Sequence, residues 1–180
     1  MKYISLILLS AAAVAIAGCA STPSVSTPGD LVANAVLKPT RDSETSGSVR
    51  FEQKGGQVWV TASIAGLSPG RHGFHIHEKG DCSSPDGLSA GGHFNPTGTQ
   101  HGNPASGPHH VGDFGNLEAD MNGMAELKTS FPVSQISLDK GAANSIIGRG
   151  LIVHAGEDDF RTQPTGNSGG RVACGVIALK

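Results

Sequence analysis

The sequence has few long runs of helix-forming residues. Glycine instead occurs 26 times and proline ten times among its 180 residues. Short runs rich in β-branched residues, separated by turn residues, are typical of an all-β sandwich or barrel. We therefore expect an all-β fold with almost no helix, and the length suits one domain with its own core.

Positive charge is also scarce. The chain has 13 lysines and arginines against 15 acidic residues, a formal net charge of -2. This balance argues against nucleic acid as a partner, because binding to phosphates depends on a basic surface. No basic amphipathic stretch is present that would bind a membrane surface directly.

No apolar run is long enough to span a membrane. The longest one, at the N-terminus, has Lys2 as its only charge and fits a secretory signal over residues 1–18. It ends in IAGC, which resembles the lipobox of bacterial lipoproteins, with Cys19 as the lipid-carrying residue. An ordinary signal peptide is the alternative. Residues 19–30, rich in Ser, Thr and Pro, then form a flexible tether.

Cysteine is limited to three residues. If Cys19 carries lipid, Cys82 and Cys174 remain as a pair, and export favours their oxidation to a disulfide. We expect residues 31–180 to form the folded domain, in the periplasm or cell envelope and anchored to a membrane only through Cys19.

Alternating apolar and polar residues predict eight strands. Within residues 57–67 the pattern places Val58 and Val60 on the core face and Trp59 on the other. A short turn of helix is expected near residues 144–148. The predicted strands are residues 31–38, 48–53, 57–67, 71–77, 117–120, 124–131, 150–155 and 171–179.

Seven of the eight histidines fall between Arg71 and Asp113, and the eighth is His154. Imidazole is the commonest metal ligand in proteins, so this density indicates a metal site. In GFHIH, strand alternation turns Phe74 and Ile76 inward and therefore places His75 and His77 together on the outer face. The further candidate ligands are His93, His101, His110, Asp113 and His154.

Six imidazoles and one carboxylate exceed the needs of one tetrahedral ion, so two metal ions are the simpler interpretation. Because no cysteine is free to supply a thiolate, the set argues against a blue-copper centre or an iron-sulfur cluster. Nitrogen-rich sites suit copper and zinc.

Six motifs occur in an order that resembles the copper,zinc superoxide dismutases: GFHIH, GDC, GGHFNP, HVGD, LIVHAGEDDF and GGRVACGVI. The short loop between His154 and Arg171 resembles the exported bacterial branch. The resemblance implies an eight-stranded antiparallel Greek-key β-barrel, related to immunoglobulin-like sandwiches, with long metal-binding loops. It implies one copper and one zinc ion per subunit, superoxide as substrate, and either a monomer or a homodimer.

The same resemblance assigns roles to individual residues. Copper would be held by His75, His77, His93 and His154, and zinc by His93, His101, His110 and Asp113. His93 would thus bridge both ions and act in catalysis.

Three further features follow from the resemblance. Asp158 would link His75 to His101. Arg171 would receive the anionic substrate beside copper. Cys82 and Cys174 would form the family's intrachain disulfide.

Some residues lie outside these motif positions. Lys79 is a candidate for guiding superoxide to the site, whereas His72 and His109 are expected to be solvated. Two other functions are weighed against the enzyme: a related domain that stores or delivers metal without turnover, and a lipid-anchored adhesion sandwich with no metal. A domain that only binds metal would need neither Arg171 nor every copper ligand, so their presence favours catalysis.

Overall fold

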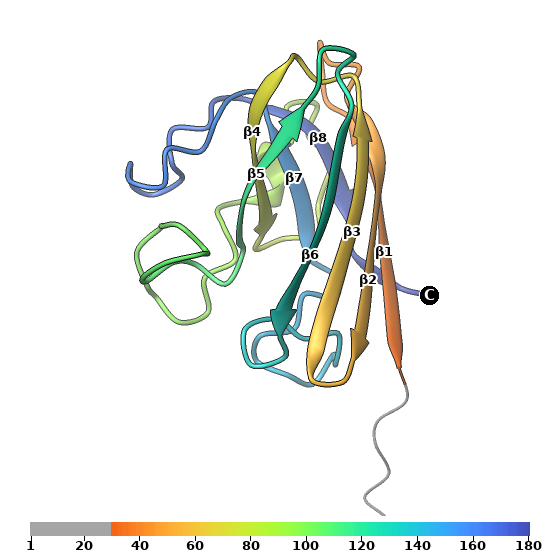
Figure 1. Ribbon diagram of the computed structural model, residues 1–180, viewed down its shortest axis with the longest axis vertical. Coiled ribbons are helices and arrows are strands. Elements are labelled where there is room, and N and C mark those ends of the chain that lie inside the picture. Colours follow the sequence, from red (N-terminus) through yellow and green to blue (C-terminus); the bar gives the residue numbers. More distant parts are fainter. Residues whose placement is uncertain (1–29) are drawn as a thin grey trace, which may run out of the picture.

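The computed structural model describes residues 30–180 (Figure 1). The signal peptide, Cys19 and nearly all of the predicted tether lie outside these residues. Within the described part of the chain, no helix is long and apolar enough to cross a membrane.

Nine strands and one short 3-10 helix make up the described chain. The N-terminal strands are β1 (Leu31–Pro39), β2 (Ser46–Lys54), β3 (Gln57–Ala65) and β4 (Gly70–His77), followed by helix η1 (Leu88–Ala90). The later strands are β5 (Asp113–Ala119), β6 (Ala125–Pro132), β7 (Gly150–His154), β8 (Arg171–Val176) and β9 (Ala178–Leu179).

The strands follow one another in the order β5-β4-β7-β8-β1-β2-β3-β6, and every pairing is antiparallel. The connection from β6 to β7 returns the chain to the far side of the sheet, beside β4, which makes a Greek-key arrangement. The short β9 pairs with the start of β1. The predicted all-β, eight-stranded Greek-key barrel is confirmed.

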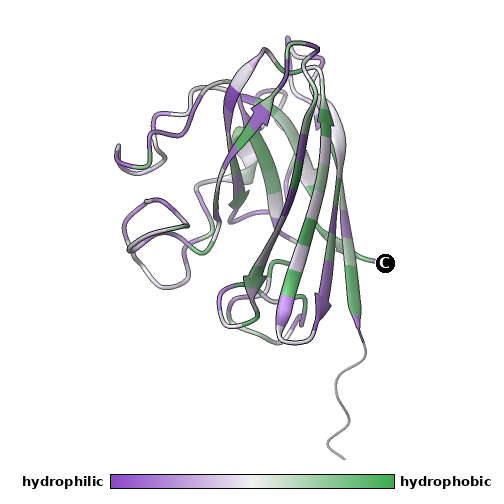
Figure 2. Cartoon of the chain, viewed as in Figure 1, coloured by the Kyte–Doolittle hydropathy of each residue, from purple (hydrophilic) through white to green (hydrophobic). Residues whose placement is uncertain are grey.

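Local chemistry explains the strand ends. Gly55 and Gly56 both have positive φ, which a two-residue turn between β2 and β3 requires. Along β3, buried and more exposed residues alternate as predicted, and the banding is visible in Figure 2. The apolar face packs on a core in which the rings of Phe114 and Phe131 stack at 4.5 Å.

Three details differ from the sequence prediction. The strand expected over residues 171–179 is divided into β8 and β9, because Ile177 between them donates to the Arg149 carbonyl outside the sheet ladder. Strand β5 begins at Asp113, four residues earlier than expected, because the segment after the histidines already pairs with β4. Residues 144–148 form turns and a bridge instead of a helical turn.

The fold brings two long loops to the same side of the barrel, where they project to the left in Figure 1. The first, residues 78–112, joins β4 to β5, and we call it the histidine loop. The second, residues 155–170, joins β7 to β8. Both loops lie over strands β4 and β7 and cover the histidines that these strands carry.

Candidate metal centre

Strand β4 supplies the first two histidines. Phe74 and Ile76 point into the core and are fully buried, as the alternation predicts. His75 and His77 lie on the opposite face, but the loops cover them and their exposed fraction is also 0%. The pair is therefore shielded from bulk water, so any charge it binds is screened less than at an open surface.

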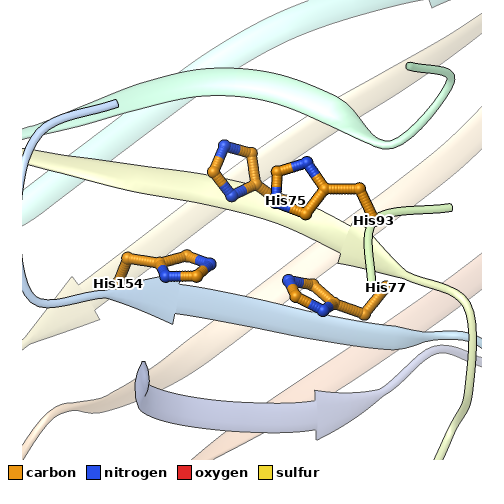
Figure 3. A group of neighbouring side chains, drawn as sticks. All are labelled: His75, His77, His93 and His154. Atoms are coloured by element: carbon orange, nitrogen blue, oxygen red, sulfur yellow. The ribbon is translucent and has the colours of Figure 1, made fainter. Parts of the chain in front are cut away.

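His154 ends β7, which pairs directly with β4, and His93 comes from the histidine loop through a bridge to His77. Figure 3 shows the four rings around a common space. One ligand atom from each of these four residues lies within 4.8 Å of the others. The group consists of His75, His77, His93 and His154.

A second group shares His93. It consists of His93, His101, His110 and Asp113, again with ligand atoms within 4.8 Å of one another. The Asp113 carboxylate lies at its centre, with Oδ1 2.8 Å from His93 Nδ1 and Oδ2 3.0 Å from His101 Nδ1. His110 Nδ1 is 3.4 Å from Oδ1. The two groups are thus adjacent and joined by one imidazole ring.

Hydrogen bonds fix which nitrogen of each ring is free. His75 Nε2 donates to Asp158 Oδ2 at 2.8 Å, and His77 Nδ1 donates to the Gly91 carbonyl at 2.9 Å. His154 Nδ1 donates to the Gly169 carbonyl at 3.3 Å. An acceptor on one nitrogen holds the proton there and leaves the lone pair of the other nitrogen available.

The unpartnered atoms test whether metal ions fit. Within residues 30–180, six buried side-chain nitrogens have no hydrogen-bond partner, and five of them belong to the two groups. They are His75 Nδ1, His77 Nε2, His93 Nε2, His154 Nε2 and His101 Nδ1. The last of these lies 3.0 Å from Asp113 Oδ2 but makes no hydrogen bond to it. Burying an unpaired polar atom is costly, so this convergence fits cations as the missing partners.

Electrostatics separates the rings into two kinds. Burial lowers the pKa of His93 to about 4 and that of His154 to about 3, so both rings are neutral at pH 7. Burial opposes protonation of His101 as well, but Asp113 and Asp158 outweigh it and raise its pKa to about 9. Although burial opposes its ionisation, the close contacts with His101, His110 and His93 hold the pKa of Asp113 well below its usual range.

Asp158 lies between the two groups. Its Oδ2 accepts from His75, and its Oδ1 accepts from His101 Nε2, both at 2.8 Å. This fully buried carboxylate therefore fixes one ring of each group at the same time.

Sequence reasoning missed the residues that hold Asp158 and His101 in place. The Asn116 side-chain amide donates to the Asp158 carbonyl and accepts from the Asp158 amide. The Gln163 side-chain amide makes the same pair of hydrogen bonds with the backbone of His101. Gly166 has a φ of +69°, and a Cβ there would overlap the Asp158 carboxylate. No local pattern marks these residues, because each contact joins distant segments.

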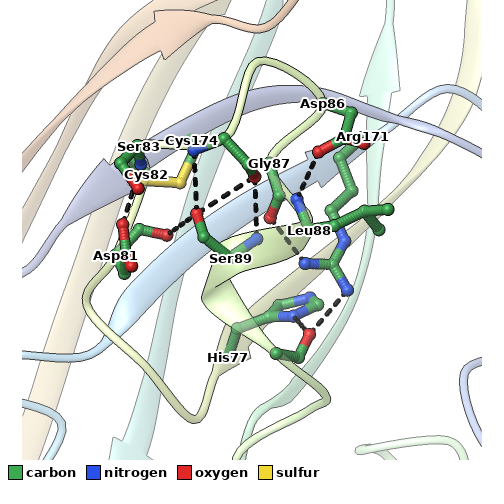
Figure 4. Close-up of a disulfide and its surroundings, with 12 residues drawn as sticks. His77, Asp81, Cys82, Ser83, Asp86, Gly87, Leu88, Ser89, Arg171 and Cys174 are labelled. Atoms are coloured by element: carbon green, nitrogen blue, oxygen red, sulfur yellow. Dashed lines mark hydrogen bonds between the residues drawn. A yellow bond between two sulfur atoms is a disulfide. The ribbon is translucent and has the colours of Figure 1, made fainter.

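Arg171 lies at the mouth of the first group. Its Nη1 and Nη2 donate to the carbonyls of Gly87 and Gly91, at 2.7 and 2.6 Å (Figure 4). A cavity of about 480 Å³ is lined by both Arg171 and His154, together with Arg41 and Asp86. A half-buried cation thus faces an open cavity beside the four histidines.

Cys82 and Cys174 form a disulfide with a Cα–Cα distance of 5.8 Å (Figure 4). The bond joins the histidine loop to β8, three residues after Arg171. Closing a loop of 92 residues contributes roughly 4 to 5 kcal/mol in the chain-entropy model. It also limits how far Gly87 moves from Arg171.

The other histidines and Lys79 fall outside both groups. His72 was expected to be solvated, and this is wrong: it is 2% exposed and hydrogen-bonds the carbonyls of His154 and Ser68. His109 is partly exposed, with Nδ1 on the His110 carbonyl. Lys79 is exposed and does not line the cavity beside Arg171.

Residues 45–177 match the family model of copper/zinc superoxide dismutase (SODC), well over half of the chain. The chain belongs to this family. It is therefore an oxidoreductase that converts superoxide to oxygen and hydrogen peroxide. The copper/zinc superoxide dismutases use one redox-active and one redox-silent ion, and the two adjacent groups of this chain are suited to hold them.

Proposed function

We propose that His75, His77, His93 and His154 hold copper, and that His93, His101, His110 and Asp113 hold zinc. The first group offers four imidazole nitrogens, which suit copper, whereas three histidines with one carboxylate suit zinc. The observation that carries the assignment is that His93 belongs to both groups, with Nδ1 toward Asp113 and Nε2 unpartnered.

Copper, when bound, supplies the one-electron chemistry of dismutation, because superoxide has to give an electron in one half-reaction and accept one in the other. Zinc has no redox chemistry. The residues of the chain supply position, charge and a proton.

His93 is the proposed proton carrier. Its Nε2 takes up a proton from solvent in the half of the cycle in which superoxide is oxidised, and holds it until the other half. That proton passes to the superoxide that accepts an electron, and solvent supplies the second proton needed to form hydrogen peroxide. Nδ1 remains directed at the Asp113 group throughout, so the ring keeps its orientation while Nε2 changes state.

Arg171 is the proposed binding residue for superoxide. Two of its N–H groups are fixed by carbonyls, which holds the guanidinium at the cavity shared with His154. Two bound divalent ions would carry a charge of +4, which one imidazolate and the carboxylates of Asp113 and Asp158 would reduce to about +1. Together with Arg171 this local positive charge would attract an anion although the whole chain is acidic.

The metal assignment is tested by loading the protein with copper and zinc and measuring both metals and superoxide removal. One of each ion per chain is expected. His93→Gln should retain the fold and lose most of the turnover together with copper affinity. If His93→Gln keeps wild-type metal content and activity, the shared-ligand assignment is wrong.

We further propose that residues 31–180 act as one domain in the cell envelope, where they remove extracytoplasmic superoxide. In this proposal residues 1–18 are a signal peptide, Cys19 carries lipid and residues 19–30 are a tether. The Cys82–Cys174 disulfide supports the location, because such bonds persist in oxidising compartments. Mass spectrometry of the mature N-terminus, with Cys19→Ser in membrane fractionation, tests the anchor.

The sequence leaves a monomer and a homodimer as alternatives for the mature enzyme. Light scattering of the metal-loaded domain distinguishes them by mass.

A further inference from the structure

The two sequence neighbours of His93 are both restrained by side chains from other segments. Its neighbours are Gly92 and Phe94, and each of them contacts a charged side chain from outside the two groups of candidate ligands. Glu78 follows directly after β4, and Arg149 precedes β7 by one residue. Neither residue belongs to a ligand group or lines the cavity beside Arg171.

Arg149 contacts the Phe94 side. Its guanidinium carbon lies 4.0 Å from the centre of the Phe94 ring, a close cation–π contact. The same guanidinium donates from Nη1 to the Glu78 carbonyl at 2.6 Å. Because Phe94 is only 4% exposed, its ring forms a fixed surface on which the guanidinium lies.

Glu78 contacts the Gly92 side. Its Oε1 accepts from the Gly92 amide at 3.2 Å, and its own amide donates to the Gly92 carbonyl at 2.9 Å. The carboxylate also occupies the space beside Gly91 where a Cβ would otherwise lie. Gly91 has a φ of +75°, so a glycine here satisfies both the backbone and the approach of Glu78.

These contacts tie together three segments that carry candidate ligands. In the sequence, Glu78 directly follows His77, and His93 lies between Gly92 and Phe94. Arg149 directly precedes β7, the strand that ends at His154. Arg149 is linked to Glu78 by its hydrogen bond, so both supports belong to one structure, which we call the 78–149 clamp.

We propose that Arg149 and Glu78 are positioning residues for the His93 ring, which they orient by bracing the backbone on either side of it. The proposal rests on the proposed function, in which His93 serves both ions. Asp113 restrains only Nδ1 of the ring, whereas a shared ligand has to aim two nitrogens in fixed directions. Bracing Gly92 and Phe94 fixes the Cα–Cβ direction of His93 and thereby the position of Nε2.

The test uses protein loaded with copper and with cobalt(II) in place of zinc. Both ions then carry unpaired electrons, which couple through a shared ring and suppress the copper electron paramagnetic resonance signal. In Arg149→Met, which keeps an apolar stem and removes the guanidinium, we expect the uncoupled copper signal to return in a measurable share of molecules. Copper affinity in a chelator competition should fall roughly tenfold, the usual effect of losing an outer contact of a ligand.

Conservative and distant variants serve as controls. Arg149→Lys keeps a cation over Phe94, and Glu78→Gln keeps the acceptor for Gly92, so both should retain most of the coupling, whereas Glu78→Ala should not. Arg50→Met removes an arginine that pairs with Glu52 on β2, away from all eight histidines, and should change neither readout. If Arg149→Met does not fold, Phe94→Leu removes the same contact.

The outcomes separate the two proposals. An uncoupled copper signal in the wild-type protein would overturn the shared-ligand assignment itself. Full coupling and unchanged copper affinity in Arg149→Met, with wild type coupled, would overturn the clamp and leave the assignment standing. If Arg149→Met lowers the melting temperature equally with and without metal and leaves the copper–cobalt coupling unchanged, the role of Arg149 is purely structural and the clamp proposal is overturned.

Discussion

Gly166 lies against the carboxylate of Asp158, and no side chain fits at residue 166 without displacing it. The residues are eight positions apart in the loop between β7 and β8. That loop folds back so that the Asp159 amide donates to the Gly166 carbonyl at 2.9 Å. Since Asp158 holds one ring of each metal group, the backbone at residue 166 sets the position of both.

Gly166→Ala should therefore impair metal binding without touching a ligand. We expect zinc affinity, measured by chelator competition, to fall about 10- to 100-fold, as for other losses of contacts that orient ligands. Gly55→Ala, in the turn between β2 and β3, is the matched control, because Gly55 also has a positive φ, +59°, and a Cβ there meets no atom within 4 Å. Equal zinc affinity in the two variants would show that Asp158 does not orient His101 for zinc.

His72 joins the start of β4 to the residue that ends β7. Its two ring nitrogens lie 2.8 Å from the His154 carbonyl and 2.9 Å from the Ser68 carbonyl. His72→Ala should destabilise the protein by about 2 to 5 kcal/mol, because it leaves a cavity and removes the ring N–H that these buried carbonyls have as a donor. Urea denaturation measures the change. His109→Ala, at a partly exposed position, should cost less than 1 kcal/mol.

Arg41 lines the cavity that contains Arg171 and His154, whereas Lys79 does not. The sequence pointed to Lys79 as a guide for superoxide, and this prediction is tested together with Arg41. We expect Arg41→Ala to lower kcat/KM about 2-fold at low ionic strength, with the difference fading as salt screens it. An unchanged salt dependence in Lys79→Ala would remove Lys79 as a guide. A larger effect at Lys79 than at Arg41 would contradict our account.

The metal-free protein should be most stable near pH 6.5. Burial lowers the folded-state pKa of His77, and it lowers that of His93 to about 4 and that of His154 to about 3. Below pH 6.5 the unfolded chain therefore binds more protons than the folded one, and stability falls as the pH is lowered. His101 has a raised pKa of about 9, so its contribution is complete below pH 6.5 and is lost as pH rises toward 9.

Thermal denaturation of chelated protein from pH 4 to 9 measures this profile. Zinc should remove the alkaline decline, because the proposed ligand atom His101 Nδ1 then holds an ion instead of a proton. A metal-free protein that becomes more stable on acidification from pH 6.5 to 4 would contradict the buried, neutral state of these rings.

Much of the fold followed from the sequence because strand alternation is a local signal. The pattern in residues 57–64 identified β3 and its core face, and GFHIH placed two histidines together opposite Phe74 and Ile76. The wrong helical turn near residues 144–148 shows the limit of local reasoning, since a bridge between Ser137 and Ser145 shapes that segment instead.

Part of the metal site could also be predicted from the sequence, because its ligands lie in local motifs. Each metal-binding motif is short and recognisable, but the contacts that orient the ligands are not. His72 looked like an ordinary polar residue because its acceptors, Ser68 and His154, are brought together only by the fold. Gln163 and Asn116 gave no local signal, since their partners are 62 and 42 residues away.

The most direct test of the account is anomalous X-ray diffraction from crystals of the copper- and zinc-loaded protein, measured at the absorption edges of both metals. We predict that Nε2 of His93 binds copper and that Nδ1 of the same ring binds zinc, whereas Asp113 binds zinc alone. Two ions bound without a common ligand, or one metal in both groups of a fully active protein, would contradict it.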